Sequence, residues 1–170
     1  MIKEKFSYVW FLNRAKLKKD DLKGIAKLMY QDVSDDSWDK ENLTKRNLDF
    51  TIESVRYIDI YTKRLMNTEF GTELLNKHFD NLVVRIGAYI GEVIKNNIKQ
   101  DFYWYESDSI HNYSHNLDGM YSNTQTQSVL YSKKRDIVIL PLNMVSQFLK
   151  GNSPYSNFLT YVEETIKQNS

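Results

Sequence analysis

Two histidines spaced four residues apart are the first side chains in this sequence that could do chemistry. His111 and His115 belong to the segment HNYSH. On a helix this spacing places two imidazoles on one face, where they can ligate one metal ion. Further ligands could come from nearby carboxylates and a distant histidine: Glu106, Asp108, Asp118 and His78. The segment lacks a helical pattern and the Glu that follows the first His in zinc peptidases. A metal-dependent hydrolase is therefore an alternative, and no metal is expected.

Other catalytic patterns in the chain are weaker. Ser109 with His111, or Ser114 with His115, would pair a nucleophile with a base, but sequence neighbours seldom have that geometry and no G-x-S-x-G segment is present. Glu92 could be a general base, although a lone glutamate on a helix is more often solvated or ion-paired. Neither G-x-x-x-x-G-K-[ST] nor G-x-G-x-x-G occurs. We therefore expect no enzyme activity and no cofactor.

Charge is unevenly distributed along a chain whose net charge is only +1. Residues 1–30 contain eight Lys and Arg against three acidic residues, and residues 31–42 contain five acidic residues against one lysine. Such runs are usually solvated faces, but they can also contact a partner. The acidic run contains one tryptophan, which either pins the segment to the core or projects as an interface anchor. We predict partner contacts from four of its residues: Asp35, Asp36, Trp38 and Asp39.

An aromatic segment, Phe102-Tyr103-Trp104-Tyr105, is the second candidate contact surface. In a strand, alternate side chains face opposite sides, so Phe102 and Trp104 would share one side and the tyrosines the other. We expect one side to be core and the other an exposed tyrosine patch, because tyrosine is favoured at protein interfaces. The predicted partner-binding tyrosines are Tyr103, Tyr105, Tyr113 and Tyr121.

Length and composition limit the classes of protein to which the chain can belong. Its 170 residues fit one domain over residues 1–170. It has no cysteine, which excludes disulfides and thiolate chemistry and fits a reducing compartment. No segment approaches the roughly 20 apolar residues of a membrane span, and the apolar residues 6–12 lack a signal-peptide cleavage site. We expect a cytoplasmic, soluble protein without a membrane partner.

The elements that must position these side chains follow from apolar spacing. We predict a helix over 17–31, an acidic ordered loop to residue 47, and a helix capped by Asp49 or Thr51. Gly71 and Thr72 should break and restart the chain before a long helix over 72–98. A strand over 101–106, a polar loop over 107–123 and a hairpin of 127–132 with 136–140 follow. Two helices close the chain, one entered at Pro141 and ended by Gly151, the other capped at Ser153-Pro154.

This order predicts an α+β fold with a helical N-terminal half, a long central helix, a small antiparallel sheet and C-terminal helices. The long helix contains Gly87 and Gly91 beside its apolar arc, each of which costs about 1 kcal/mol against alanine. Charged neighbours exclude a membrane span, so we predict that another backbone packs closely there. Tyr89 should border the core, and Glu92 should share one side of the helix with it.

The segment GAYIGEVIKNN at 87–97, with LDFTIESV at 48–55, resembles a group of small uncharacterised bacterial proteins. These proteins share a GAYxGEvi helix, followed by a short strand and a segment like Leu140-Pro141. Some resemble cytoplasmic immunity or accessory proteins of bacterial antagonism systems. The resemblance covers residues 48–150 and carries no catalytic residues.

The leading hypothesis is a non-enzymatic protein that binds another protein. As an immunity protein it would neutralise a secreted toxin by occluding its site. The alternatives are the metal-dependent hydrolase and a nucleic-acid accessory protein that uses the basic N-terminal helix.

Overall fold

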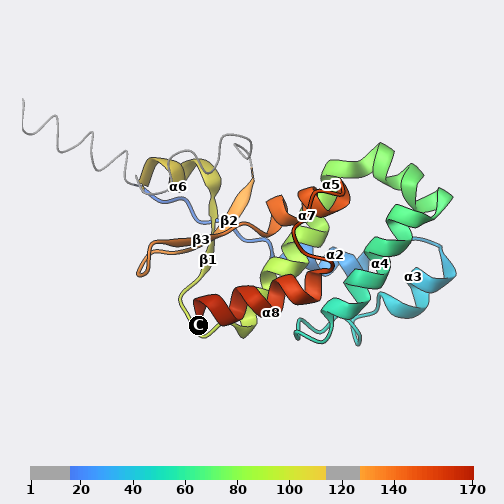
Figure 1. The fold of residues 1–170 in the computed structure, drawn as a ribbon, viewed down its shortest axis with the longest axis horizontal. Helices are drawn as coiled ribbons and strands as arrows, with labels where there is room; N and C mark the ends of the chain where they lie inside the picture. Colours follow the sequence, from blue (N-terminus) through green and yellow to red (C-terminus); the bar gives the residue numbers. More distant parts are fainter. Residues whose placement is uncertain (1–15, 114–126) are drawn as a thin grey trace, which may run out of the picture. The chain divides into compact units, whose positions relative to one another are not determined.

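The predicted long helix forms the centre of a helical unit. The computed structural model describes residues 16–113 and 127–170, which form two compact units (Figure 1). The helical unit comprises Leu22–Gln100 and Leu140–Ser170, and the sheet unit comprises the described residues of Met1–Asp21 and Asp101–Ile139. The expected α+β class is confirmed. The expectation of one domain stays a prediction.

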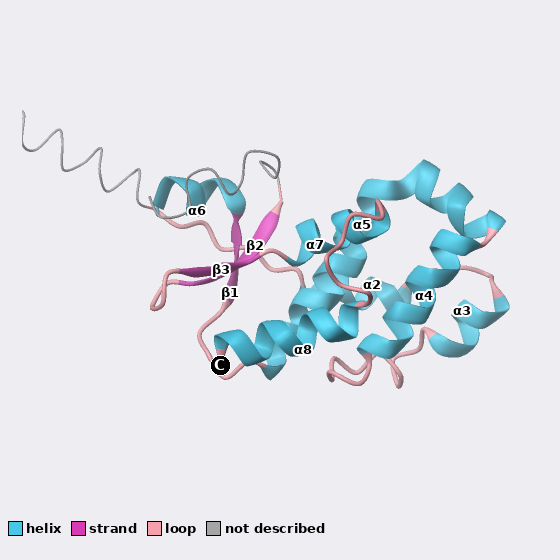
Figure 2. Ribbon diagram, in the orientation of Figure 1, coloured by secondary structure: helices cyan, strands magenta, loops and turns pink. Residues whose placement is uncertain are grey.

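The helical unit contains six helices (Figure 2). The long helix α5 packs against α2, α4, α7 and α8. Between Leu82 and Ile94 nearly every residue of α5 is buried, which is typical of a helix surrounded by protein. The six helices are α2 (Lys23–Gln31), α3 (Ser37–Asn42), α4 (Val55–Asn67), α5 (Glu69–Asn97), α7 (Pro141–Leu149) and α8 (Phe158–Asn169).

Helix α5 begins at Glu69, three residues before the predicted start. The Thr68 side chain caps it by accepting the N–H of Gly71 at 3.0 Å. Gly71 therefore lies in the first turn and does not break the chain. A Cβ atom at this glycine would lie 2.4 Å from the Cα of Leu65, so only glycine lets α4 and α5 approach this closely. Within α5, the backbone leaves the helical region at His78 (φ −133°, ψ 32°).

The predicted close packing at Gly87 is confirmed. A Cβ there would lie 2.8 Å from Cγ and 2.9 Å from Cα of Leu142, which is in the first turn of α7. The missing side chain lets α7 lie directly against α5. Gly91 is also buried within α5.

Tyr89 is fully buried in α5 and anchors the segment that precedes α4. Its hydroxyl lies 2.7 Å from the Ser54 hydroxyl and accepts the N–H of Phe50 at 3.2 Å. The Phe50 and Tyr89 rings stack with centroids 4.8 Å apart. Phe50 has a φ of 64°, which is unfavourable for a bulky residue. The side chain of Asn97 donates to the Phe50 carbonyl at 3.0 Å, so three contacts hold this strained backbone.

Three predictions for the helical unit are wrong in part. The first helix starts at Lys23 rather than residue 17, because Lys18 and Lys19 pair with a strand instead. The acidic segment is ordered as predicted but contains the short helix α3. The last helix starts at Phe158, and its side-chain cap is Asn157 rather than Ser153.

The sheet unit contains three antiparallel strands in the order β1-β2-β3, and the predicted hairpin is confirmed as β2 and β3. The strands are β1 (Tyr103–Glu106), β2 (Ser128–Ser132) and β3 (Ile137–Ile139). Helix α6 (Ser107–Tyr113) packs on β1 and β2, so the predicted polar loop is wrong at its start. The free edge of β1 is covered by the extended residues 18–20, through hydrogen bonds that involve Lys18 and Asp20.

The tyrosine side of β1 is packed at Tyr105 and exposed at Tyr103. Tyr105 is buried, and its ring meets Tyr131 edge-on with centroids 6.0 Å apart. Tyr113 of α6 covers Tyr131 in the same way, at 6.3 Å. The prediction that Tyr105 is exposed is therefore wrong, because α6 covers this side of the sheet. Tyr103 is 44% exposed, with the Lys19 ammonium 4.8 Å from its ring centroid.

Candidate functional site

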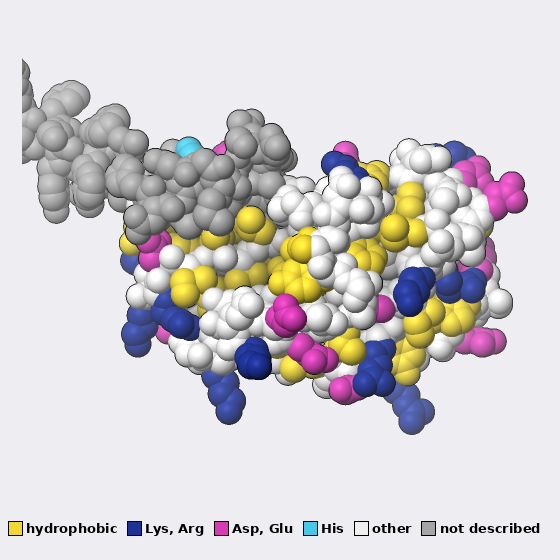
Figure 3. Space-filling view, in the orientation of Figure 1, with side chains coloured by type: hydrophobic (Ala, Val, Ile, Leu, Met, Phe, Trp, Pro, Cys, Tyr) yellow, Lys and Arg dark blue, Asp and Glu magenta, His cyan; other side chains and the backbone are white. Residues whose placement is uncertain are grey.

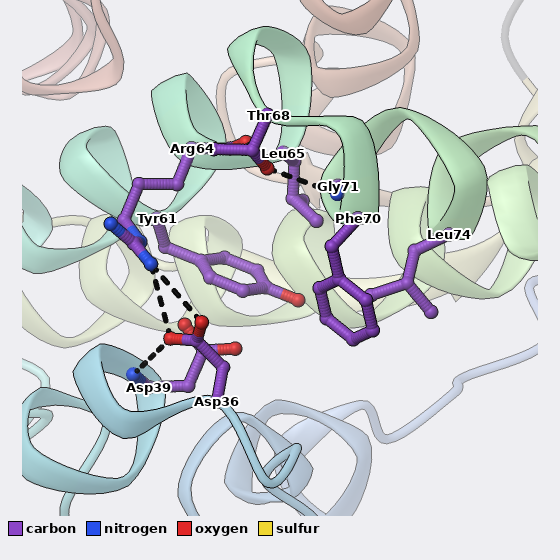
Figure 4. Close-up of a pocket in the computed structure, with 9 residues that line it drawn as sticks. All are labelled: Asp36, Asp39, Tyr61, Arg64, Leu65, Thr68, Phe70, Gly71 and Leu74. Atoms are coloured by element: carbon purple, nitrogen blue, oxygen red, sulfur yellow. Dashed lines mark hydrogen bonds and ion pairs between the residues drawn. The ribbon is translucent and has the colours of Figure 1, made fainter.

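The helical unit has a concave surface, which is formed by the acidic segment, α4 and the first part of α5. Asp36 is the N-cap of α3 and accepts the N–H of Asp39 at 3.0 Å. Arg64 of α4 donates to both Asp36 oxygens, at 3.1 and 3.2 Å (Figure 4). The same guanidinium lies 5.4 Å from the ring centroid of Trp38, within cation–π range. Arg64 therefore fixes α3 to α4 through one carboxylate and one indole.

The two carboxylates of this surface have pKa values shifted in opposite directions. The backbone N–H of Asp39 and the charge of Arg64 hold the pKa of Asp36 below its ordinary value. Burial raises the pKa of Asp39, and the neighbouring charge of Asp36 raises it further. Asp39 is only 5% exposed and accepts the Ser34 hydroxyl at 2.7 Å. Asp36 is thus a stable anion, whereas ionised Asp39 is poorly solvated.

Tyr61 of α4 lines the concave surface. Burial raises the pKa of its hydroxyl to about 12, with a further contribution from the charge of Asp39. Figure 4 shows Tyr61 extending from α4 toward Phe70 of α5. Phe70 is 52% exposed. The side chain of Tyr61 therefore remains neutral at physiological pH and presents a hydroxyl and an aromatic face to the cavity.

Two hollows share Tyr61 and Leu74 in their linings. The smaller hollow, of about 80 Å³, contains the Asp36, Asp39 and Arg64 side chains together with Phe70. The larger hollow, of about 340 Å³, is lined by residues of the α2–α3 connection, of α4 and of α5. These are Asp32, Val33, Ser34, Tyr61, Leu74, His78, Asn81, Leu82 and Arg85. Arg85 pairs with Asp32 at 2.7 Å within the lining of the larger hollow.

The structure brings together part of the predicted acidic contact surface. Asp36 and Asp39 lie in the lining of the smaller hollow, and Trp38 lies beneath Arg64. Trp38 is partly exposed, so its ring is neither fully buried nor fully projecting. Asp35 is fully exposed and forms an ion pair with Lys40 at 3.4 Å. On the part of the helical unit visible in Figure 3, basic and acidic side chains are interspersed rather than gathered by sign.

The remaining predicted site residues are located elsewhere or outside the described residues. Tyr103, Tyr105 and Tyr113 belong to the sheet unit, and Tyr121 lies outside the described residues. Glu92 is 1% exposed and lies 3.8 Å from the Lys95 ammonium, so it is ion-paired rather than solvated.

The candidate metal ligands are only partly described. His111 is exposed in the last turn of α6, and His115 lies outside the described residues. Within residues 16–113 and 127–170, no three His, Asp or Glu side chains are grouped closely enough to hold a metal ion.

Sequence reasoning missed the basic and aromatic half of the concave surface. Tyr61, Arg64, Phe70 and Arg85 belong to no motif, and Tyr61 has the spacing of an inward-facing helix position. A usable signal was present, because the acidic segment needs cations to balance it and each of the two following helices supplies one arginine. Arg85 is 53 positions from Asp32, so local spacing gives no reason to connect the two.

Of the residues that the structure describes, none belongs to a helix with the length and apolar character needed to cross a bilayer. No protein-family model, curated protein or solved structure significantly matches the chain.

Proposed function

We propose that this chain is a non-enzymatic protein that binds another protein through the groove surface. This surface consists of α3, the smaller hollow and the exposed ring of Phe70. The observation that carries the proposal is the concentration of Trp38, Tyr61 and Arg64 around one concavity, with Phe70 at its edge. Tryptophan, tyrosine and arginine dominate the binding energy of protein interfaces.

The carboxylates of the groove surface support binding rather than acid–base catalysis. Asp36 caps α3 and bonds Arg64, and Asp39 accepts the Ser34 hydroxyl. A general base needs a carboxylate within reach of a substrate proton and with a suitable pKa. The Asp36 carboxylate is held by donors that stabilise its charge, which suits a fixed recognition surface.

The proposed partner is a secreted toxin whose active site would be occluded, as expected of an immunity protein. This part of the proposal depends on the resemblance of residues 48–150. An occluding surface needs rigid, preformed side chains, because ordering them on binding would reduce affinity. The bonds among Asp36, Arg64 and the α3 backbone provide that rigidity.

Site-specific photocrosslinking in the cells that naturally produce the protein tests the proposal. A benzophenone amino acid replaces Phe70, and the matched control carries it in place of Glu164, an exposed residue of α8. We expect one protein to be captured from position 70 and not from position 164. Asp35→Lys should reduce the capture, since Asp35 is fully exposed and its replacement leaves the helix cap intact.

Identical captured proteins from both positions, or none from position 70, would count against the groove surface as the interface. If a partner is captured, co-expression measures whether wild type relieves its toxicity and whether Phe70→Arg does not. Relief by both variants would reject occlusion through this surface.

A further inference from the structure

The smaller hollow contains one more negative than positive formal charge. Among its described lining residues, Asp36, Asp39 and Arg64 are the charged ones. Arg64 donates to both oxygens of Asp36, so its charge is directed to that carboxylate. Asp39 instead accepts a neutral hydroxyl, that of Ser34. When both carboxylates are ionised, Asp39 is the one without a direct bond to Arg64.

The surroundings of Asp39 make a cation favourable beside it. The residue is 5% exposed, and a buried carboxylate is unfavourable unless a positive charge compensates it. The Asp36 carboxylate repels Asp39 and the Arg64 charge attracts it, but burial outweighs that attraction and the pKa of Asp39 is raised. A ligand that brings one positive charge would neutralise the hollow and offset the desolvation of Asp39.

The walls and the size of the hollow favour an organic cation. Tyr61 and Phe70 approach each other from α4 and α5 (Figure 4), and aromatic faces attract ammonium and guanidinium groups. The hollow measures about 80 Å³. One water needs roughly 10–15 Å³ by the same measure, so the hollow has room for a group of several non-hydrogen atoms. Small-molecule sites are usually larger, at roughly 300–1,000 Å³.

We propose that the smaller hollow binds an arginine or lysine side chain of the partner protein, with Asp39 as its counter-ion and the rings of Tyr61 and Phe70 beside it. This inference rests on the proposed function and names the chemistry that the partner presents. The partner's basic side chain enters past Phe70, which at 52% exposure is the most accessible ring of the lining.

Nuclear magnetic resonance titration of the full chain tests the charge requirement. The probe is N-acetyl-arginine amide, and its neutral isostere N-acetyl-citrulline amide is titrated in parallel. We expect saturable shifts of the Asp39 and Gly71 backbone amides with the arginine compound, and at least tenfold weaker binding of the citrulline compound. Equal responses to both compounds would overturn the proposal.

A matched pair of variants tests the role of Asp39. Asp39→Asn removes the charge but keeps an acceptor for the Ser34 hydroxyl, and we expect at least tenfold weaker binding. Glu164→Gln removes one negative charge from an exposed side chain of α8 and should change binding by less than twofold. Equal losses in both variants would indicate a general charge effect and reject the site. If Asp39→Asn does not fold, binding of the arginine compound to Phe70→Leu provides a second test, because the substitution is at an exposed position.

Experiments with the photocrosslinked partner distinguish failure of this inference from failure of the proposed function. If the partner binds Asp39→Asn as tightly as wild type, the groove surface remains an interface and the basic side chain is rejected. If the arginine compound binds but no partner is captured from position 70, the hollow is retained and the protein-binding function is rejected.

Discussion

The carboxylate of Asp59, in the middle of α4, accepts the backbone N–H of Phe158 at the start of α8 at 2.6 Å. It also accepts the N–H of Leu159 at 3.1 Å. The first N–H groups of a helix have no partner within the helix, and a negative charge there is favourable. Asp59 therefore connects two helices and caps the second from outside its own sequence.

Asp59→Ala should lower the free energy of unfolding by about 1–2 kcal/mol, because it leaves two helix-terminal N–H groups without their acceptor. Urea denaturation followed by circular dichroism measures the change. Asp49→Ala is the control, since this exposed carboxylate accepts only from nearby Thr51 among the described residues. An equally large loss at Asp49 would show that the effect does not come from the α8 terminus.

Gly87→Ala should destabilise the protein by about 1–3 kcal/mol through overpacking, because the new methyl group would lie 2.8 Å from the Leu142 side chain. Gly24→Ala is the matched control: it is also in a helix, and its Cβ would have nothing within 4 Å. The control should gain up to about 1 kcal/mol from helix propensity. Thermal unfolding of both variants compares them. A stable Gly87→Ala protein would mean that α7 shifts easily away from α5.

Tyr89→Phe should cost about 1–3 kcal/mol in stability, because it removes the acceptor of the Phe50 N–H and one of two partners of the Ser54 hydroxyl, which keeps its bond to the Thr51 carbonyl. Tyr103→Phe removes a hydroxyl from a residue that is 44% exposed and should change stability by less than about 0.5 kcal/mol. Urea midpoints measure both. Similar midpoints for the two variants would contradict the role of Tyr89 as an anchor.

Asp39→Asn should become more stable relative to wild type as pH rises. Burial and the charge of Asp36 raise the pKa of Asp39 in the folded state, so its contribution to stability is fully present below the unfolded value and is lost as pH rises through the folded value. Asparagine does not ionise. Denaturation of both proteins at pH about 3.5 and about 7 measures the difference.

The opposite dependence should be seen for Asp36, whose pKa is lowered by the Asp39 N–H and by Arg64. Its contribution to stability is present above the unfolded value and is lost as pH falls through the folded value. Asp36→Asn should therefore lose most stability near neutral pH. If both variants respond to pH in the same direction, the assignment of the two carboxylates is wrong.

The parts of the fold that depend on local pattern could be predicted from the sequence. Three features are indicated by residues that are close in the sequence. They are the apolar spacing of α5, the close packing at Gly87, and the Pro141 and Gly151 boundaries of α7. The start of α8 could not be predicted in this way, because Asp59 is 99 positions from Phe158. Likewise, Lys18 and Lys19 have a helical pattern, but hydrogen bonding to β1 outweighs it.

The candidate site was predictable as a charged segment but not as a cavity. Asp36 and Trp38 stood out by residue type, yet their surroundings depend on Arg64, which is 28 positions from Asp36. The exposed tyrosine patch failed at Tyr105 for a related reason. Strand alternation predicts the side of the sheet on which Tyr105 lies, but it does not predict that α6 covers that side.

The departure from helical geometry at His78 has a consequence for local unfolding. It divides α5 into a first length that lines the smaller hollow and a second length, from Leu82, that is mostly buried and reaches only the larger hollow. Cooperative opening follows contiguous hydrogen-bonded and packed units, so the interruption lets the first length open without the second. Amide hydrogen exchange should therefore be faster before His78 than after Leu82. Such a difference would make the first length of α5 a separate unit of local stability, which opens at a free energy below that of global unfolding.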